Sequence, residues 1–157
     1  MPIFDTKLQE FKVFILIIRL VIGFVWFGTV LRRIAIPNFQ QRITSMAEGG
    51  TFVPQVLMDV LVENWSVIFL IVLSIEILSS FSLLSGTLAR GGALLATING
   101  FAIGLSGIGL GLVDLLIPWF IAFLSLILLL FTHPGLYKGI DTKLEQKDLP
   151  KFLKIWI

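Results

Sequence analysis

Four long apolar stretches dominate this sequence of 157 residues. A helix needs about 20 mostly apolar residues to cross the hydrocarbon core of a bilayer. Each stretch approaches that length, so the sequence predicts an all-α fold, an integral membrane four-helix bundle formed as one domain over residues 1–157. The expected spans cover residues 11–31, 66–84, 91–112 and 115–131, with Pro118 in the first turn of the last span, an outer loop over 32–65 and a cytoplasmic tail over 132–157.

The composition excludes several other classes of protein. Hydrophobic residues make up 57% of the chain and charged residues 14%, whereas a soluble domain is typically about 45–50% apolar and about 25% charged. An ordinary soluble enzyme and a disordered chain are therefore excluded. Five of the seven lysines lie in the C-terminal tail, so the net charge of +2 does not indicate a nucleic-acid partner.

The residue types also limit the chemistry. The chain has no Cys and a single His, His133, which removes thiolate nucleophiles, disulfides, Cys-ligated iron–sulfur clusters and haems held by paired histidines. No group of Asp, Glu and His has the spacing of a metal site. We therefore expect no metal or haem in this chain. Any redox chemistry must use a diffusible carrier, a partner subunit or a non-covalently bound cofactor.

Charged residues in the loops predict the orientation in the lipid membrane. With four spans, both termini and the second loop lie on one side, which carries eight Lys and Arg residues against three on the other, Arg32, Arg33 and Arg42. Short loops rich in Lys and Arg stay in the cytoplasm, so we expect a multi-pass protein of the cytoplasmic membrane with both termini inside. Asp5 and Glu10 precede the first stretch, which predicts a permanent span rather than a cleaved signal peptide.

The outer loop contains one patterned segment. Apolar residues recur at helical spacing between Val53 and Leu61, with Asp59 and Glu63 on the opposite face. This pattern predicts a short amphipathic helix on the outer surface. Two interpretations are open: the helix only connects two spans at the membrane interface, or it forms a lid over a cavity between the spans.

Small residues mark one face of the third span. Gly92, Ala96, Gly100 and Gly104 recur every four residues, a spacing that lets two helix backbones approach closely. The pattern predicts that the helices pack tightly into one bundle.

Two ionisable residues lie inside the spans, Arg19 in the first and Glu76 in the second. Such residues cost about 2.5–3.5 kcal/mol on insertion scales and usually face the bundle interior with a partner. Counting about 1.5 Å per residue from the cytoplasmic ends places Arg19 about 10 Å deep, Glu76 about 12 Å and Asn99 about 13 Å. We therefore predict an Arg19–Glu76 ion pair completed by Asn99. The pair either fixes helix register or forms the polar floor of a quinone pocket in which Glu76 passes protons.

Arg32 and Arg33 end the first span on the outer side. Arginines in this position often extend to lipid headgroups. Two adjacent guanidinium groups followed by Arg42 can also hold a small dianion, and both interpretations are open.

Several of these features together resemble the DoxD/DoxX family of membrane proteins. The segment RLVIGFVWFGTVLRRIAIPNF over residues 19–39 looks like the family's first span, a glycine- and aromatic-rich helix that ends in a Trp/Arg-rich edge and a proline. The wider family pattern has a glutamate within the second span, then a glycine, then Thr and Arg before the third span, which here are Glu76, Gly86, Thr87 and Arg90. The resemblance covers residues 13–131.

This resemblance implies the DoxD-like large subunit of a thiosulfate:quinone oxidoreductase in the respiratory chain of a sulfur-oxidising archaeon. The implied reaction joins two thiosulfates into tetrathionate and passes two electrons to a membrane quinone. The implied partners are a DoxA-like small subunit and terminal oxidase subunits. On this expectation the quinone binds near Arg19, Glu76 and Asn99, with Arg19 and Glu76 catalytic, and thiosulfate binds Arg32 and Arg33.

Alternatives follow from the residues themselves. Arg19 and Arg32 are about 20 Å apart along one helix, so either the anion and quinone sites are distinct or one assignment is wrong. A non-catalytic subunit that anchors a terminal quinol oxidase assembly fits the glycine spacing and short loops equally well. A small transporter or channel is a third possibility.

Overall fold

The computed structural model describes residues 2–49, 51, 53–106, 112–131, 139–141 and 143, and of residues 2–10, 112–115 and 131 the backbone only. Six helices follow one another in this part of the chain: α1 (Pro2–Ala35), α2 (Phe39–Gly49), α3 (Gln55–Glu63), α4 (Trp65–Ser85), α5 (Ala89–Ser106) and α6 (Leu112–Phe131). The expected all-α class is confirmed for these residues. His133 and most of the expected tail lie outside the described residues.

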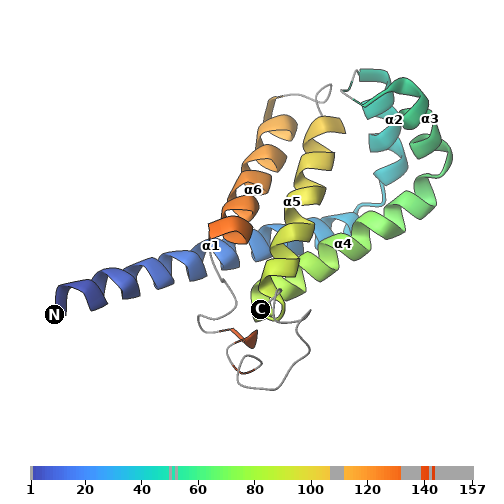
Figure 1. Cartoon of the computed structure of the whole chain (residues 1–157). Helices are drawn as coiled ribbons and strands as arrows, with labels where there is room; N and C mark the ends of the chain where they lie inside the picture. The colour runs from blue at the N-terminus through green and yellow to red at the C-terminus, as the bar shows by residue number, and fades with distance from the viewer. Residues whose placement is uncertain are drawn as a thin grey trace.

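The four long helices pack in chain order. α1 packs against α4, α4 against α5 and α5 against α6, and α6 also contacts α1. Figure 1 shows α5 and α6 side by side, α2 and α3 beside the beginning of α4, and the N-terminal part of α1 extending away from the other helices. Residues from all four long helices form the core cluster, among them Ile22, Trp26, Leu83, Ala93, Ala96 and Leu128.

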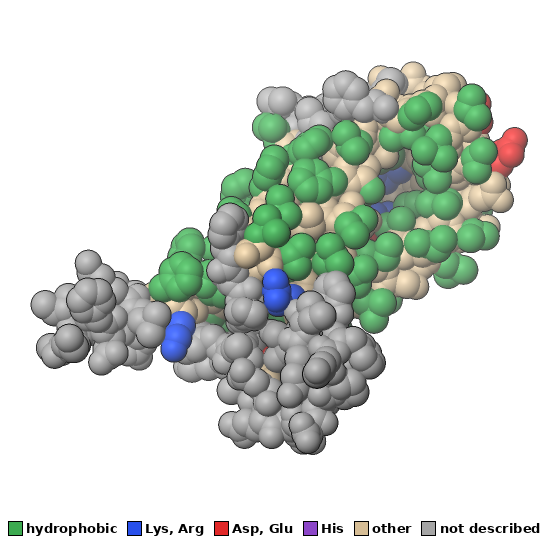
Figure 2. Space-filling view, viewed as in Figure 1, with side chains coloured by type: hydrophobic (Ala, Val, Ile, Leu, Met, Phe, Trp, Pro, Cys, Tyr) green, Lys and Arg blue, Asp and Glu red, His purple; other side chains and the backbone are tan. Residues whose placement is uncertain are grey.

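Large apolar side chains also cover the outside of the long helices. Phe24 and Leu70 are each 61% exposed, and Figure 2 shows hydrophobic side chains over most of the described surface on that face. Among the described residues, two helices are long and apolar enough to cross a membrane, Phe11–Ala35 and Trp65–Ser85. The part of α6 over Leu116–Leu130 is a shorter apolar helix. By length and composition, two of the four expected spans therefore meet the requirement for crossing.

The fourth long helix begins before the expected fourth span. α6 begins at Leu112, three residues before the expected start at residue 115, and residues 107–111, expected near the end of the third span, lie outside the described residues. Pro118 consequently lies inside α6 rather than in its first turn.

The segment expected as the outer loop contains two helices rather than one. α3 matches the expected short helix. α2 was not expected, because its sequence is polar, and Ile43 is its one buried residue. In α3 the fully buried side chain is Met58, whereas Val56 and Val60, expected on the inner face, are 78% and 48% exposed. The hydrophobic pattern therefore predicts the helix correctly but not the face that packs.

The close packing expected from the small residues of α5 is confirmed. A Cβ atom added at Gly92 would lie 2.6 Å from the Cβ of Ser82 on α4, and one added at Gly100 would lie 2.9 Å from the Cβ of Ala122 on α6. α5 therefore uses this face against both of its neighbours.

Replacing Gly100 with Ala is expected to lower the free energy of unfolding by about 1–3 kcal/mol, the usual cost of overpacking a close contact. The added methyl group would also lie 3.1 Å from the backbone oxygen of Pro118, which cannot move independently. Gly28→Ala on α1 is the matched control, since no atom lies within 4 Å of its added Cβ. Thermal unfolding of both variants in detergent micelles measures the difference, and equal stability would contradict the close contact between α5 and α6.

Candidate functional site

An ion pair between α1 and α4 forms the centre of the candidate site. Nε of Arg33 donates a hydrogen bond to Oε2 of Glu76 at 2.7 Å, and the side chains are 18% and 0% exposed. The sequence analysis assigns these two residues to different sites, Glu76 to a pair with Arg19 and Arg33 to a pair with Arg32. In the structure, one residue from each expected site, Glu76 and Arg33, forms the ion pair.

The expected Arg19–Glu76 ion pair is wrong because of helix register. α1 and α4 are antiparallel, since the hydroxyl of Ser80 donates to the carbonyl of Gly23 at 3.2 Å and a Cβ added at Gly86 would lie 2.8 Å from Nη1 of Arg19. Arg19 is therefore level with the end of α4. Glu76 lies ten residues before that end, which is about 15 Å along a helix.

An aromatic pair packs on Arg33. The guanidinium carbon lies 5.1 Å from the ring centroid of Phe39, the first residue of α2, and Phe39 packs edge-on against Phe69 of α4 with centroids 5.4 Å apart. At the other end of α2, the hydroxyl of Thr51 donates to the carbonyl of Leu105 in α5 at 3.1 Å. The segment expected as the outer loop is thus anchored on α1, α4 and α5 and contacts the ion pair directly.

Several buried polar atoms have no hydrogen bond among the described residues, and four of them are Nε1 of Trp26, Oε1 of Glu76, Oγ of Ser79 and Nδ2 of Asn99. Each of these side chains is at most 5% exposed. Ser79 lies one turn after Glu76 on α4, and Asn99 lies beside Glu76, close enough to act on its carboxylate, although its amide nitrogen makes no hydrogen bond of good geometry. Trp26 shares the core cluster with Ala96, which is one turn before Asn99 on α5.

The unpaired atoms need hydrogen-bond partners that the described residues do not supply. An unmet buried donor or acceptor costs about 1–3 kcal/mol, so several in one region call for a partner. The group offers two N–H donors, one hydroxyl and one carboxylate oxygen. This set can bind a small molecule that carries two carbonyl-type acceptors, and Glu76 can exchange a proton with it.

The residues found around Glu76 therefore differ from those expected for a quinone site. The structure brings Glu76 and Asn99 together, leaves Arg19 outside, and adds Arg33, Trp26 and Ser79. Trp26 could have been found from the sequence, since a buried indole N–H usually requires a partner.

The structure does not bring Arg32 and Arg33 to one point. Arg33 turns to Glu76, while the side chain of Arg32 is exposed. Consecutive residues diverge by about 100° on a helix of 3.6 residues per turn, so two adjacent arginines do not form one binding site by themselves.

A further buried carboxylate lies at the opposite end of α4 and α5. Asp141 is 0% exposed, and its two oxygens accept hydrogen bonds from the backbone N–H groups of Leu88 at 2.7 Å and Ala89 at 3.0 Å. Burial raises the pKa of Asp141, and the two N–H donors and the positive charge of Arg19 lower it by smaller amounts. The sequence analysis missed Asp141 because it lies 52 residues from the helix that it contacts.

Comparison with family models, with curated proteins and with solved structures gives no match for this chain. Among the described residues, no group of three or more His, Cys, Asp and Glu side chains is arranged to hold a metal ion. The interpretation of the site therefore depends on its own geometry.

Glu76→Gln is expected to lower the free energy of unfolding by about 3 kcal/mol, the lower end for a broken buried pair because Arg33 is partly exposed. Adding Arg33→Gln should restore most of that loss, since no unpaired charge remains. Adding Arg19→Gln instead serves as the control and should restore none. Thermal unfolding of the three variants in detergent tests this, and rescue by Arg19→Gln would contradict the observed pairing.

Proposed function

We propose that the chain is an integral membrane four-helix bundle of the DoxD/DoxX type and the membrane subunit of a thiosulfate:quinone oxidoreductase. The observation that carries this proposal is the inverted polarity of the described residues. Charged and amide side chains are buried between the helices around Glu76, whereas large apolar side chains are exposed on their outer faces. A soluble protein shows the opposite distribution.

In this proposal, α5 and α6 cross the membrane together with α1 and α4. α5 and α6 pack on the apolar helix α4 and on each other, and their outer faces carry exposed apolar side chains such as Ile98 at 54% and Phe120 at 63%. Helices that share one bundle with two spans and expose such faces are suited to the same lipid environment. The Lys and Arg bias of the sequence supports a position in the cytoplasmic membrane with both termini inside.

A quinone headgroup matches the unpaired atoms around the ion pair. Its two carbonyl oxygens are hydrogen-bond acceptors, and Trp26 and Asn99 each offer an N–H donor without a described partner. Reduction of a quinone to a quinol consumes two electrons and two protons. Arg33 holds one oxygen of the Glu76 carboxylate, and the other, Oε1, can take up a proton from water and pass it to a carbonyl oxygen, once for each of the two protons.

Thiosulfate supplies the electrons in this proposal. Two thiosulfate ions form one sulfur–sulfur bond to give tetrathionate and release two electrons, which balances the reduction of one quinone. Because Arg33 is engaged with Glu76, we assign thiosulfate binding to the exposed Arg32 together with groups of a DoxA-like small subunit. Terminal oxidase subunits would reoxidise the quinol.

The direct test is thiosulfate-dependent reduction of a short-chain quinone analogue by the purified chain, with and without its small subunit. Reduction that requires this chain supports the proposal. Reduction by neither preparation would contradict it and favour a non-catalytic subunit that anchors an oxidase assembly.

Trp26→Phe is expected to raise the apparent KM for the quinone analogue about two- to tenfold, which corresponds to one neutral hydrogen bond. The melting temperature should also fall, because Phe fills less of the core cluster than Trp26 does, so the KM is measured well below it. Trp65→Phe at the start of α4 is the matched control and should leave the KM unchanged. Steady-state kinetics at saturating thiosulfate measures both variants, and equal KM values would remove Trp26 from the proposed site.

A further inference from the structure

We infer that residues 139–141 form a latch: this C-terminal segment supplies the N-cap of α5 and holds the α4–α5 turn in a conformation that the turn's own residues do not favour. The inference is independent of the proposed function, since it concerns the opposite end of α4 and α5 from the Arg33–Glu76 pair.

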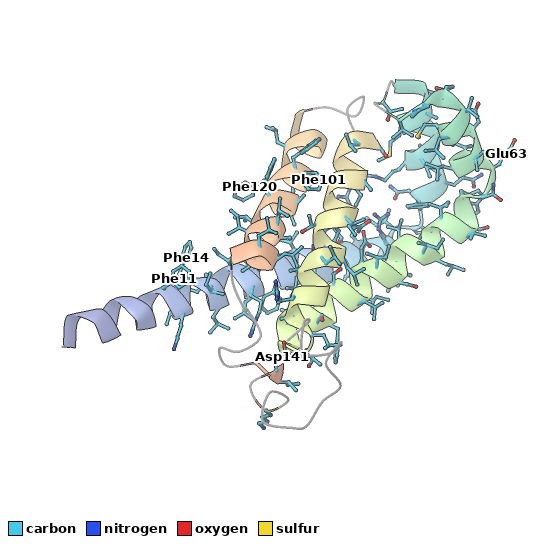
Figure 3. The ribbon with its side chains drawn as sticks, in the orientation of Figure 1. Phe11, Phe14, Glu63, Phe101, Phe120 and Asp141 are labelled. Atoms are coloured by element: carbon cyan, nitrogen blue, oxygen red, sulfur yellow. The ribbon has the colours of Figure 1, made fainter. Side chains whose placement is uncertain are left out.

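The backbone of the latch is hydrogen-bonded to the end of α4. The N–H of Ile140 donates to the carbonyl of Ser85 at 3.2 Å, and the N–H of Asp141 donates to the carbonyl of Gly86 at 2.9 Å. A Cβ added at Gly86 would lie 2.7 Å from the Cα of Gly139, so the two backbones approach too closely for a side chain. Figure 3 shows Asp141 at the lower ends of α4 and α5.

The carboxylate of the latch performs a task that the local sequence cannot. The first N–H groups of a helix have no acceptor within the helix, and Ser, Thr, Asp or Asn at the N-cap usually provides one. The residue before α5 is Leu88, whose side chain accepts no hydrogen bond. Asp141 accepts from both Leu88 and Ala89 instead, and it does so from a segment that follows the last long helix.

The conformation of Leu88 shows why the turn needs this support. Leu88 has a φ of 49° and Gly86 a φ of 67°. The left-handed region suits glycine, but it costs a residue such as leucine about 1–2 kcal/mol. Asp141 holds the N–H of Leu88, and the hydroxyl of Ser82 donates to its carbonyl at 3.1 Å. Without Asp141, Leu88 can relax to a negative φ, which changes how α5 begins.

The latch also faces a buried cation. Arg19 is 1% exposed and acts electrostatically on Asp141, and a Cβ added at Gly86, at the end of α4, would lie 2.8 Å from its Nη1. The same three-residue segment therefore joins α1, the end of α4 and the start of α5. Its release would loosen the lower end of all three helices together.

Thiol labelling tests the latch, because the chain has no Cys of its own. A thiol introduced by Ala89→Cys lies at a position that is 0% exposed and should react slowly with a maleimide in detergent. Adding Asp141→Ala should raise the rate about five- to thirtyfold, which corresponds to the loss of an N-cap. Asp141→Asn keeps one acceptor oxygen and should give an intermediate rate. Adding Leu88→Gly to Asp141→Ala should lower the rate again, because glycine adopts a positive φ without strain.

Ala93→Cys provides the matched control, since position 93 is also 0% exposed but lies one turn further along α5. Asp141→Ala should leave its labelling rate unchanged. An unchanged rate at position 89, or an equal rise at positions 89 and 93, would overturn the inference. Hydrogen exchange of the Leu88 and Ala89 amides in the chain without introduced thiols gives a second measurement: Asp141→Ala should accelerate both, and unchanged exchange would also contradict the latch.

Discussion

A buried carboxylate between apolar helices requires a partner, and the pair that Glu76 forms with Arg33 depends on how α1 and α4 are aligned. That alignment is set by contacts along the whole interface, from Arg19 beside Gly86 to the hydrogen bond between Ser80 and Gly23. The cost of leaving either charge alone makes other registers of the two helices unfavourable. The position of α2, which packs its first aromatic ring on Arg33, follows from the same pair.

Buried carboxylates lie at two levels of the fold, and they differ in how many of their oxygens accept hydrogen bonds. At the lower end, Asp141 uses both oxygens on backbone donors and lies near Arg19, which closes the junction of three helices. Around Glu76, several donors and acceptors have no partner among the described residues. A carboxylate that accepts hydrogen bonds on both oxygens is suited to holding helices in place, whereas a carboxylate with one oxygen unbound is suited to binding. This difference supports separate structural and functional roles for the two ends.

The sequence reveals ionisable residues inside the apolar stretches, but the partner predicted for Glu76 was wrong. An ionisable side chain in an apolar stretch is visible without any structure, and so is the need for a partner. Depth counted from the ends of apolar stretches placed Arg19 and Glu76 together, because it assumed that every helix starts at the same membrane surface. α1 begins at Pro2, well before its apolar part, so such counting carries an error of several residues and selects the wrong arginine.

Local information was sufficient for the all-α class, for α3 and for the close packing of α5, since apolar length, helical spacing and small residues act within a few turns of chain. The polar helix α2, the beginning of α6 and the packed face of α3 depended on their neighbours and were not predicted. Glu76 and its partner Arg33 are 43 positions apart in the sequence, and Asp141 and Ala89 are 52 positions apart. Such contacts are decided by helix register and by the path of the chain around the bundle, because the energy of a buried polar group depends on what packing brings beside it.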